Sequence, residues 1–283
     1  MKKILLLIST FSICSLDSLG QQRQYGSKAY LEFLKPKEGL TNVISNQQLD
    51  INLPITLSIT FVLLTKEITK DQLLKQVISL NQDFSNETFL KAENQSAHYK
   101  NLATDTEIRF CETFEVIEAY TDEKIDFLLG QEYARKFNES NKNSILVFVT
   151  NLENMAGYAQ MPGYQIETDA IFIDKSYLYG TNIDGYNLGK TLTHLMGTYF
   201  GLGEMWNCED DGVFDTPLHT VIHTNANKSV SSCYDFLIFE MPENFMDGTP
   251  DKFQNMFTLG QKEKMLFELS TRRANLLEIR TCK

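Results

Sequence analysis

The feature that most constrains the fold is an apolar helical segment at residues 188–200, together with the glycines that follow it. The apolar residues at helical spacing are Leu188, Leu192, Leu195, Met196 and Tyr199. Gly201 and Gly203 come directly after this segment, and a glycine past a helix end permits the left-handed turn that stops it. After Gly203 the chain is rich in Asp, Gly, Pro and Asn and shows little periodicity until Thr258. An ordered α/β part is therefore expected before this helix, and a loop-rich part after it.

The residues before this helix alternate between strand and helix patterns. We expect strands at residues 54–65, 108–120, 144–150 and 170–174, and helices at residues 70–84 and 125–137. A last helix is expected at residues 260–277. The chain has 283 residues, 42% of them hydrophobic, which is enough to bury one large domain or two closely packed subdomains. The predicted fold class is α/β (α+β), with a twisted mixed sheet, a backing helix and a loop-rich end closed by a helix.

The N-terminus has the pattern of an export signal. Two lysines precede an apolar stretch at residues 4–13 that is too short to span a bilayer, and Ser18 and Gly20 are small residues suited to cleavage. We expect a signal peptide at residues 1–20 and a secreted or periplasmic protein. Cys14 could indicate lipid attachment, but a bulky isoleucine stands before it, where a small residue is expected. No later apolar run reaches the about 20 residues of a membrane-spanning helix.

The net charge excludes some classes of binding partner, and the number of cysteines bears on whether the protein contains disulfides. The net charge of −11 disfavours nucleic acid and anionic membrane surfaces as partners, because both are polyanions. The cysteines outside the signal are Cys111, Cys208, Cys233 and Cys282. An even number in an exported chain predicts disulfides, but spacing alone does not choose among the three full pairings. No CxxC pair is present, so a cysteine zinc site is not expected.

The segment at residues 189–204 reads Gly-Lys-Thr-Leu-Thr-His-Leu-Met-Gly-Thr-Tyr-Phe-Gly-Leu-Gly-Glu. It resembles the zinc helix of metzincin metallopeptidases, HExxHxxGxxH, and especially that of the pappalysin family. In such a motif two histidines four residues apart share one helix face and hold one metal ion. The glutamate is the general base, and the glycine turn returns a third histidine to the metal.

The first histidine and the glycine of this motif are present, but the general base and the two other ligands are replaced. His194 stands at the first ligand position, Leu195 replaces the general base and Thr198 replaces the second histidine. Gly201 is kept for the turn, and Glu204 stands at the third ligand position. Zinc sites normally need three or four protein ligands, so zinc is expected to be lost or weakly held. The resemblance therefore predicts a catalytically inactive pseudopeptidase; the alternative is an active zinc metalloendopeptidase with non-standard ligands.

Other segments support the same family in the same order along the chain. They lie at residues 108–111, 157–162, 211–217, 244–247 and 257–261, and the whole match covers roughly residues 54–270. The resemblance implies a metzincin fold. After a lead-in at residues 21–50, it divides the chain into an upper subdomain at residues 51–202 and a lower subdomain at residues 203–283. The lower subdomain contains a Met-turn and the C-terminal helix.

The resemblance also implies roles for residues outside the helix. Met246 would lie beneath the metal as a structural floor, and Cys208 would pair with Cys233. Family members can bind calcium in this loop region. The residues here that offer the oxygen ligands calcium prefers are Asp210, Asp211, Asp215 and Thr216. A solvated acidic turn is the alternative interpretation of these residues.

Several residues have more than one interpretation. His194 is a relic, a hydrogen-bonded core histidine or a residual ligand, and Glu204 is expected to be a solvated surface residue. His219 and His223 are four apart but lie in a stretch without a helical pattern, so we expect both at the surface. In the alternative of an active enzyme, His219 would be the outside ligand. A peptide or protein partner is expected to bind as an extended strand along a sheet edge. A purely structural or assembly role is the third hypothesis.

Overall fold

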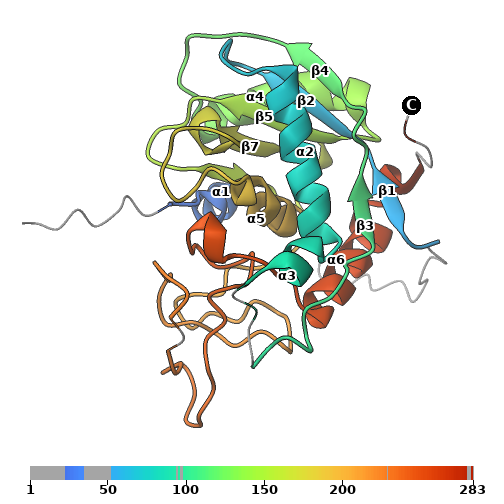
Figure 1. Ribbon diagram of the computed structural model, residues 1–283. Coiled ribbons are helices and arrows are strands. Elements are labelled where there is room, and N and C mark those ends of the chain that lie inside the picture. The colour runs from blue at the N-terminus through green and yellow to red at the C-terminus, as the bar shows by residue number, and fades with distance from the viewer. Residues whose placement is uncertain are drawn as a thin grey trace, which may run out of the picture.

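The computed structural model describes residues 23–34, 52–93, 95, 98–227, 229–278 and 282. The predicted signal peptide and most of the predicted lead-in segment lie outside these ranges. In Figure 1 the sheet and its helices form the upper part of the molecule, and loops form the lower part. Within the described ranges, no helix combines the length and the apolar character needed to cross a membrane.

The predicted helices and strands are found, with shorter bounds in most cases. The strands are β1 (Ile55–Leu57), β2 (Ile59–Leu63), β3 (Ile108–Phe110), β4 (Glu115–Glu118), β5 (Ile145–Thr150), β6 (Gly157–Ala159) and β7 (Ile171–Asp174). The helices are α1 (Ser27–Phe33), α2 (Lys70–Phe84), α3 (Glu87–Lys91), α4 (Phe127–Asn138), α5 (Lys190–Tyr199) and α6 (Leu259–Arg272). The α5 helix is the predicted constraining helix, and it begins two residues later than expected.

The main sheet has five strands in the order β4-β2-β5-β7-β6. The first four strands are parallel to their neighbours, and β6 is antiparallel to β7 at one edge. A second, smaller pair joins β1 to β3 in parallel. The mixed sheet predicted from the sequence is therefore confirmed, and β6 forms one of its edges.

Both faces of the main sheet are covered by helices. Because successive side chains of a strand point to opposite faces, Phe61 and Val147 pack against α2 and α5 while Val62 and Phe148 pack towards α1 and α4. This double burial explains why β5 is a continuous apolar run, as is usual for parallel strands covered on both faces.

The turn after α5 requires a glycine. Gly201 has a φ of +94°, a conformation that other residues adopt only with strain. A Cβ atom at this position would also lie 2.7 Å from Cγ of Glu268 in α6. The glycine therefore allows the chain to turn sharply and pass close beneath α6.

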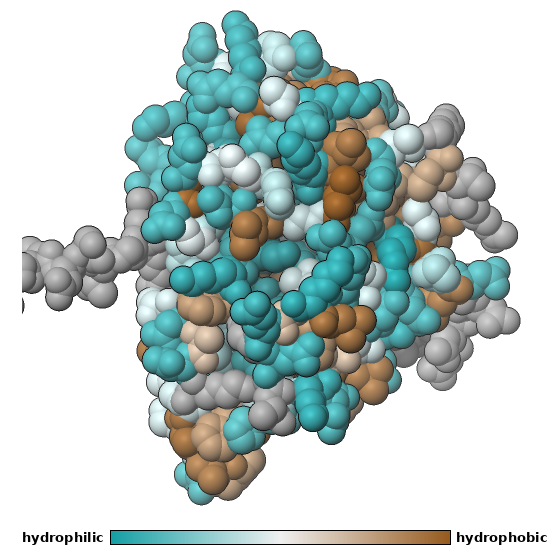
Figure 2. Space-filling view, in the orientation of Figure 1, coloured by the Kyte–Doolittle hydropathy of each residue, from teal (hydrophilic) through white to brown (hydrophobic). Residues whose placement is uncertain are grey.

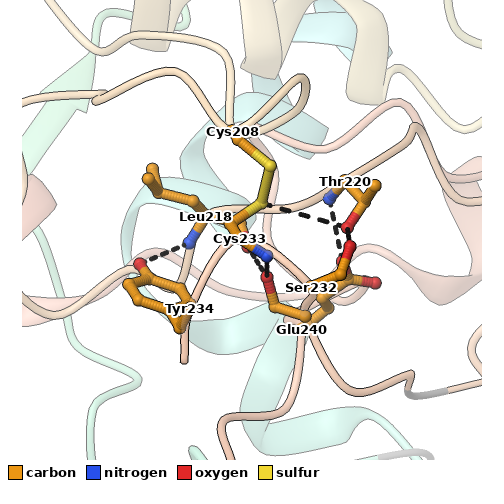
Figure 3. The surroundings of a disulfide bond; sticks show 8 residues. Cys208, Leu218, Thr220, Ser232, Cys233, Tyr234 and Glu240 are labelled. Atoms are coloured by element: carbon orange, nitrogen blue, oxygen red, sulfur yellow. Dashed lines mark hydrogen bonds between the residues drawn. A yellow bond between two sulfur atoms is a disulfide. The ribbon is translucent and has the colours of Figure 1, made fainter. Parts of the chain in front are cut away.

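Two disulfides stabilise the fold. Cys208 pairs with Cys233, as the family resemblance implies, and Cys111 pairs with Cys282. Figure 3 shows the first disulfide within the loops, where the amide of Leu218 donates to the hydroxyl of Tyr234 at 2.9 Å. Closing a loop of this size stabilises the fold by roughly 3 kcal/mol in the chain-entropy model. The division into two subdomains at residue 202 stays a prediction.

The loops also expose apolar side chains. Phe236 and Leu237 are 63% and 73% exposed. Brown residues gather at the lower tip of the molecule in Figure 2, where Figure 1 places the loops.

The described part of the predicted lead-in, residues 23–34, contains α1 and packs against the edge strand β6. Arg23 and Tyr30 are almost completely buried, at 0% and 1% exposed. The residues that bury these two side chains are distant in the sequence. The local sequence pattern therefore could not predict their burial.

Candidate functional site

His194 lies in the middle of α5 and is completely buried. Its Nδ1 lies 3.0 Å from the carbonyl oxygen of Phe245, and because a carbonyl can only accept, Nδ1 is the protonated nitrogen. The Nε2 atom therefore carries a lone pair, and it has no hydrogen-bond partner among the described residues. Burial, followed by the charge of Arg23, lowers the pKa of His194 to about 3. The side chain is a neutral imidazole with one free acceptor.

The two other ligand positions of the motif also carry buried polar atoms. Oγ1 of Thr198 and Oε1 of Glu204 have no partner within the described ranges. Glu204, expected to be a solvated surface residue, is half-buried, and one of its carboxylate oxygens is enclosed. Burial raises the pKa of Glu204 to about 7, with the charge of Lys28 opposing the increase. The position of the general base is apolar, because Leu195 is completely buried in the main core.

The N-terminal segment covers His194. The ring of Tyr25 stacks on the imidazole of His194, with centroids 3.7 Å apart and planes 5° from parallel. Burial strongly raises the pKa of Tyr25, and its hydroxyl oxygen is another buried atom without a described partner. Trp206 lies at 6.0 Å from His194. Two aromatic rings therefore lie beside the imidazole, and that of Tyr25 is stacked directly on it.

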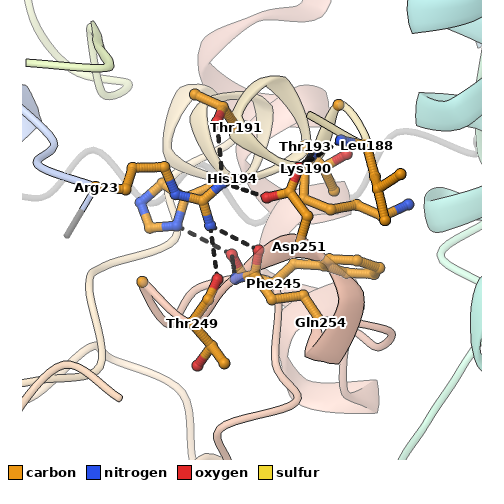
Figure 4. A network of polar contacts seen from close by, with 12 residues as sticks. Arg23, Leu188, Lys190, Thr191, Thr193, His194, Phe245, Thr249, Asp251 and Gln254 are labelled. Carbon is orange, nitrogen blue, oxygen red and sulfur yellow. Dashed lines mark hydrogen bonds and ion pairs between the residues drawn. The ribbon is translucent and has the colours of Figure 1, made fainter. Parts of the chain in front are cut away.

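Arg23 reaches from the same segment into a buried polar pocket beside His194 (Figure 4). Its guanidinium donates to Oδ1 of Asp251 at 2.7 Å and to Oε1 of Gln254 at 2.7 Å. It also donates to Oγ1 of Thr191 at 2.9 Å and to the carbonyl of Thr249 at 3.0 Å. This is a fully buried ion pair with additional hydrogen bonds, the condition under which a buried charge is tolerated.

His219 and His223 are buried, so the prediction that both lie at the surface is wrong. The carboxylate of Asp247 lies between them: its Oδ2 is 3.0 Å from Nδ1 of His219 and also accepts from Nδ1 of His223. On its other side His223 places Nε2 at 2.9 Å from Oε2 of Glu240. The loop that contains His219 and His223 can fold into the interior because both imidazole rings form hydrogen bonds with buried carboxylates.

The hydrogen bonds of this cluster fix the protonation of both rings. The amide of Met241 donates to Nε2 of His219 at 2.8 Å, so the proton of His219 sits on Nδ1 and is donated to Asp247. His223 faces a carboxylate with each nitrogen and is an imidazolium. Burial opposes this charge, but the hydrogen bonds and charges of Asp247 and Glu240 raise the pKa of His223. Burial would raise the pKa of Asp247, but the hydrogen bonds and charges of His219 and His223 lower it.

The ligand atoms of His219, His223 and Asp247 lie within 4.8 Å of one another, close enough to hold a metal ion. The protonation pattern argues against this use. A metal at Nδ1 of His219 would require the proton on Nε2, which already faces the amide of Met241. The cluster is thus better described as a buried charge network than as a metal centre.

The candidate calcium ligands serve the local backbone. Asp211 accepts from the amide of Val213 at 3.0 Å and from Oγ1 of Thr216 at 2.6 Å. Asp210 accepts from the amide of Gly212 at 2.8 Å. Asp215 instead accepts at the start of α6, from Oγ1 of Thr258 at 2.7 Å and from the amide of Gly260 at 2.9 Å. Calcium binding stays a prediction.

Met246 packs against α5, in agreement with the structural role that the resemblance implies for it. It is completely buried, and a Cβ atom on Gly197 would lie 2.6 Å from its sulfur. The glycine lets the helix approach the methionine closely. Its description as a Met-turn residue stays an interpretation.

The raised pKa of Glu204 predicts a pH-dependent stability difference in the variant Glu204→Gln. The unfolded chain releases this proton near 4.5, whereas the folded chain holds it up to about 7, so wild-type stability falls as the pH rises through this window. The interval corresponds to about 3 kcal/mol at most. Glu204→Gln should therefore be more stable than wild type at about pH 8 and equal to it at about pH 4.5.

The measurement is denaturant unfolding of both proteins in metal-free buffer at the two pH values. Glu209→Gln is the matched control, because this neighbouring side chain is 57% exposed. A Glu204→Gln variant that is less stable than wild type at the higher pH would contradict the burial of an unpartnered carboxylate.

The comparisons with known proteins agree on one family. The family model described as "Pregnancy-associated plasma protein-A" matches residues 134–270. An extracellular metalloprotease of Uncinocarpus reesii is 31% identical over 140 residues, which are 46% of this chain and 50% of that protein. One from Arthroderma gypseum is 26% identical over 275 residues, covering 90% of this chain and 86% of that protein. Apart from the latter, the chain spans about half the length of such curated relatives.

Solved structures show the same fold. Mature mirolysin of Tannerella forsythia, in complex with a cleaved peptide, superimposes with a TM-score of 0.68 at 23% identity. The match covers 79% of this chain and 96% of mirolysin. A promirolysin mutant of the same organism gives a TM-score of 0.68 at 22% identity, covering 80% of this chain and 86% of that chain. The ordered motifs, the mixed sheet and these relatives all support a likeness of the chain to the pappalysin-type family of metzincin metallopeptidases.

Proposed function

We propose that this chain is a secreted pappalysin-type pseudopeptidase, which keeps the fold of the family without its peptide hydrolysis. The observation that carries the proposal is the complete burial of Leu195 in the apolar core at the position of the general base. A hydrocarbon side chain cannot move a proton, and loss of general-base catalysis typically costs ~100- to 10,000-fold in rate.

The residues at the ligand positions do not fit a catalytic zinc ion. His194 offers one free nitrogen and Glu204 one carboxylate oxygen, whereas Thr198 offers only a neutral hydroxyl. Three protein ligands are the usual minimum for a catalytic site. The pKa of Glu204, near 7, further weakens it as a ligand, because zinc would have to displace its proton. These residues therefore support no catalytic step through a metal ion.

Binding of a peptide or protein in the cleft is the function that this fold can keep without catalysis. The relatives of the family are extracellular metalloproteases, and mirolysin was solved with a cleaved peptide. The expected binding mode needs a correction, because residues 24–26 already pair with the edge strand β6. A partner that adds to this edge must displace them.

Export from the cytoplasm is part of the same proposal and is supported by the disulfides. Two disulfides join cysteines that are far apart in the sequence, and such bonds persist in oxidising compartments. The signal peptide at residues 1–20 remains part of the proposal. A purely structural role, without any partner in the cleft, is the outcome if no binding is detected.

The test is incubation of the purified wild-type protein with zinc and a peptide library, followed by mass spectrometry. We expect no cleavage that a chelator abolishes, and we expect the matched variant His194→Ala to give the same peptide profile as wild type. Chelator-sensitive cleavage that disappears in His194→Ala would overturn the proposal and favour the active metalloendopeptidase with non-standard ligands.

A further inference from the structure

We propose that residues 219–227, here called the histidine loop, form a pH-sensitive element that stays closed while His223 is protonated and opens in alkaline solution. The two carboxylates that face this ring, those of Glu240 and Asp247, lie outside the loop, so the protonated ring joins the loop to the rest of the fold. The inference goes beyond the proposed function, because it holds whether or not the protein binds a partner or cleaves a peptide.

The contacts of the ring require its second proton. A neutral imidazole has one N–H donor and one acceptor nitrogen, whereas an ionised carboxylate can only accept. Nδ1 of His223 contacts Oδ2 of Asp247, and Nε2 lies 2.9 Å from Oε2 of Glu240. Loss of the proton would leave a nitrogen lone pair facing a carboxylate oxygen inside the protein, which is an unfavourable arrangement. The closed loop therefore depends on the imidazolium form.

Titratable groups face the ring of His223 from each described segment that packs against it. Asp247 and Glu240 lie on its two sides, and His219 comes from the histidine loop itself, with ring centroids 4.8 Å apart. Burial would raise the pKa values of Asp247 and Glu240, but hydrogen bonds lower both, so the two carboxylates stay ionised as the pH rises. His219 is neutral, because its Nε2 accepts from the amide of Met241 at 2.8 Å. His223 is therefore the group of this cluster whose charge changes.

The same two carboxylates hold the backbone of the histidine loop. Oε1 of Glu240 accepts from the amide of Thr220 at 2.8 Å (Figure 3), and Oδ1 of Asp247 accepts from the amide of His223 at 3.2 Å. Two carboxylates that face a neutral ring would repel each other and separate. Their separation would release these two amides, so the backbone of the loop opens together with the ring.

The histidine loop also supports the segment that follows α5. The amide of His219 donates to the carbonyl of Met205 at 2.6 Å, and the carbonyl of His219 accepts from the amide of Cys208 at 3.0 Å. Trp206 lies between these two residues in the sequence, and its ring is 6.0 Å from that of His194. Opening of the loop therefore frees the segment that places Trp206 beside His194.

Hydrogen exchange of the full-length protein from about pH 6 to about pH 9 tests the opening. The reporters are the amides of Thr220 and His223, and the control is the amide of Leu64, which donates to the carbonyl of Val149 at 2.9 Å. Burial lowers the pKa of His223, but Asp247 and Glu240 raise it above the ordinary 6.5, so opening releases one proton above this pH. After correction for the intrinsic rate, reporter protection should therefore fall about tenfold per pH unit from 6.5 up to the folded pKa. Below and above this window it should be constant, and the Leu64 amide should not change.

Titration of the wild-type histidine rings by NMR identifies the group that releases the proton. The chain has four histidines, so their ring signals can be followed separately. The ring of His223 should titrate above 6.5, at the pH where the loss of reporter protection ends. This measurement needs no variant, so it tests the proposal even if a substitution at His223 prevents folding.

His223→Lys and His223→Gln separate the charge from the ring. Lysine keeps a cation between the carboxylates in alkaline solution, so protection of the Thr220 amide should stay high across the whole range. Glutamine is neutral, so protection should be low at every pH, at the level that wild type reaches above the folded pKa of His223. The matched control His98→Gln replaces an exposed histidine and should behave as wild type does.

Three results would each overturn the proposal. The first is wild-type protection of the Thr220 amide that does not change from about pH 6.5 to about pH 9. The second is a His223 ring that titrates at or below 6.5. The third is a folded His223→Gln variant that keeps the pH dependence of wild type.

Discussion

Two substitutions, Thr198→His and Glu204→His, are expected to give near-stoichiometric zinc binding to a chain that we propose binds little or none without them. The first ligand is already prepared, because Nδ1 of His194 is fixed by Phe245 and Nε2 has a free lone pair. Residues 194 and 198 share one face of α5, as two ligands of one metal ion must. Tyr25 stacks on the face of the imidazole, whereas the lone pair lies in the ring plane, so the stack does not block it.

The expected readouts are the zinc content after dialysis and the thermal midpoint with and without zinc. Free zinc at about 1,000 times the dissociation constant stabilises a folded protein by about 4 kcal/mol. The control adds His194→Ala to the double variant and should abolish both effects. Adding Leu195→Glu instead supplies the general base, and only this triple variant is expected to cleave peptides. A folded double variant that takes up no zinc would show that the cleft has lost the geometry of the family.

Asp247→Asn is expected to be the most destabilising of the conservative polar substitutions in the loops. The carboxylate accepts from both histidine rings and from the backbone amides of His223 and Gly248. The variant would leave the buried imidazolium of His223 without one of its counterions and would place an amide group opposite N–H donors. Breaking a buried ion pair by removing one partner typically costs about 3–5 kcal/mol.

The measurement is chemical unfolding of wild type and Asp247→Asn near neutral pH, monitored by the single tryptophan. Asp235→Asn is the matched control, because Asp235 is an exposed residue of the same loops and should change stability by less than about 0.5 kcal/mol. Equal stability of Asp247→Asn and wild type would contradict the charge network. A chelator that destabilises wild type as much as Asp247→Asn does would indicate a metal ion in the cluster.

Most of the fold could be predicted because its elements have recognisable local sequence patterns, and because the motifs of the family occur in the expected order along the chain. Helix α5 has apolar residues at helical spacing and a glycine stop, and β5 is an uninterrupted apolar run. The replaced positions of the zinc motif could be identified because the segment resembles the zinc helix of the family, in which the ligand spacing is fixed. The pairing of Cys208 with Cys233 followed from the family resemblance, whereas spacing left the partner of Cys111 open.

The parts of the site that were missed depend on long-range contacts. Arg23 meets Asp251 across 228 residues of sequence, and a single arginine in a polar segment gives no sign of such a partner. His219 and His223 have no apolar periodicity around them, and their burial depends on Asp247 and Glu240 satisfying them. Glu204 is half-buried, with one carboxylate oxygen enclosed and without a described partner. Charged residues are rarely buried unless paired, so propensity alone favours the surface for all of them.

The most direct test of the central claim is the metal content of the folded wild-type protein, determined by elemental analysis after purification without chelators. Loss of the general base at Leu195 and of two ligands at Thr198 and Glu204 predicts zinc far below one ion per chain, and no gain in thermal stability when zinc is added. Zinc near one ion per chain, retained on dialysis and lost in His194→Ala, would contradict the claim that this pappalysin-type fold has given up its catalytic metal.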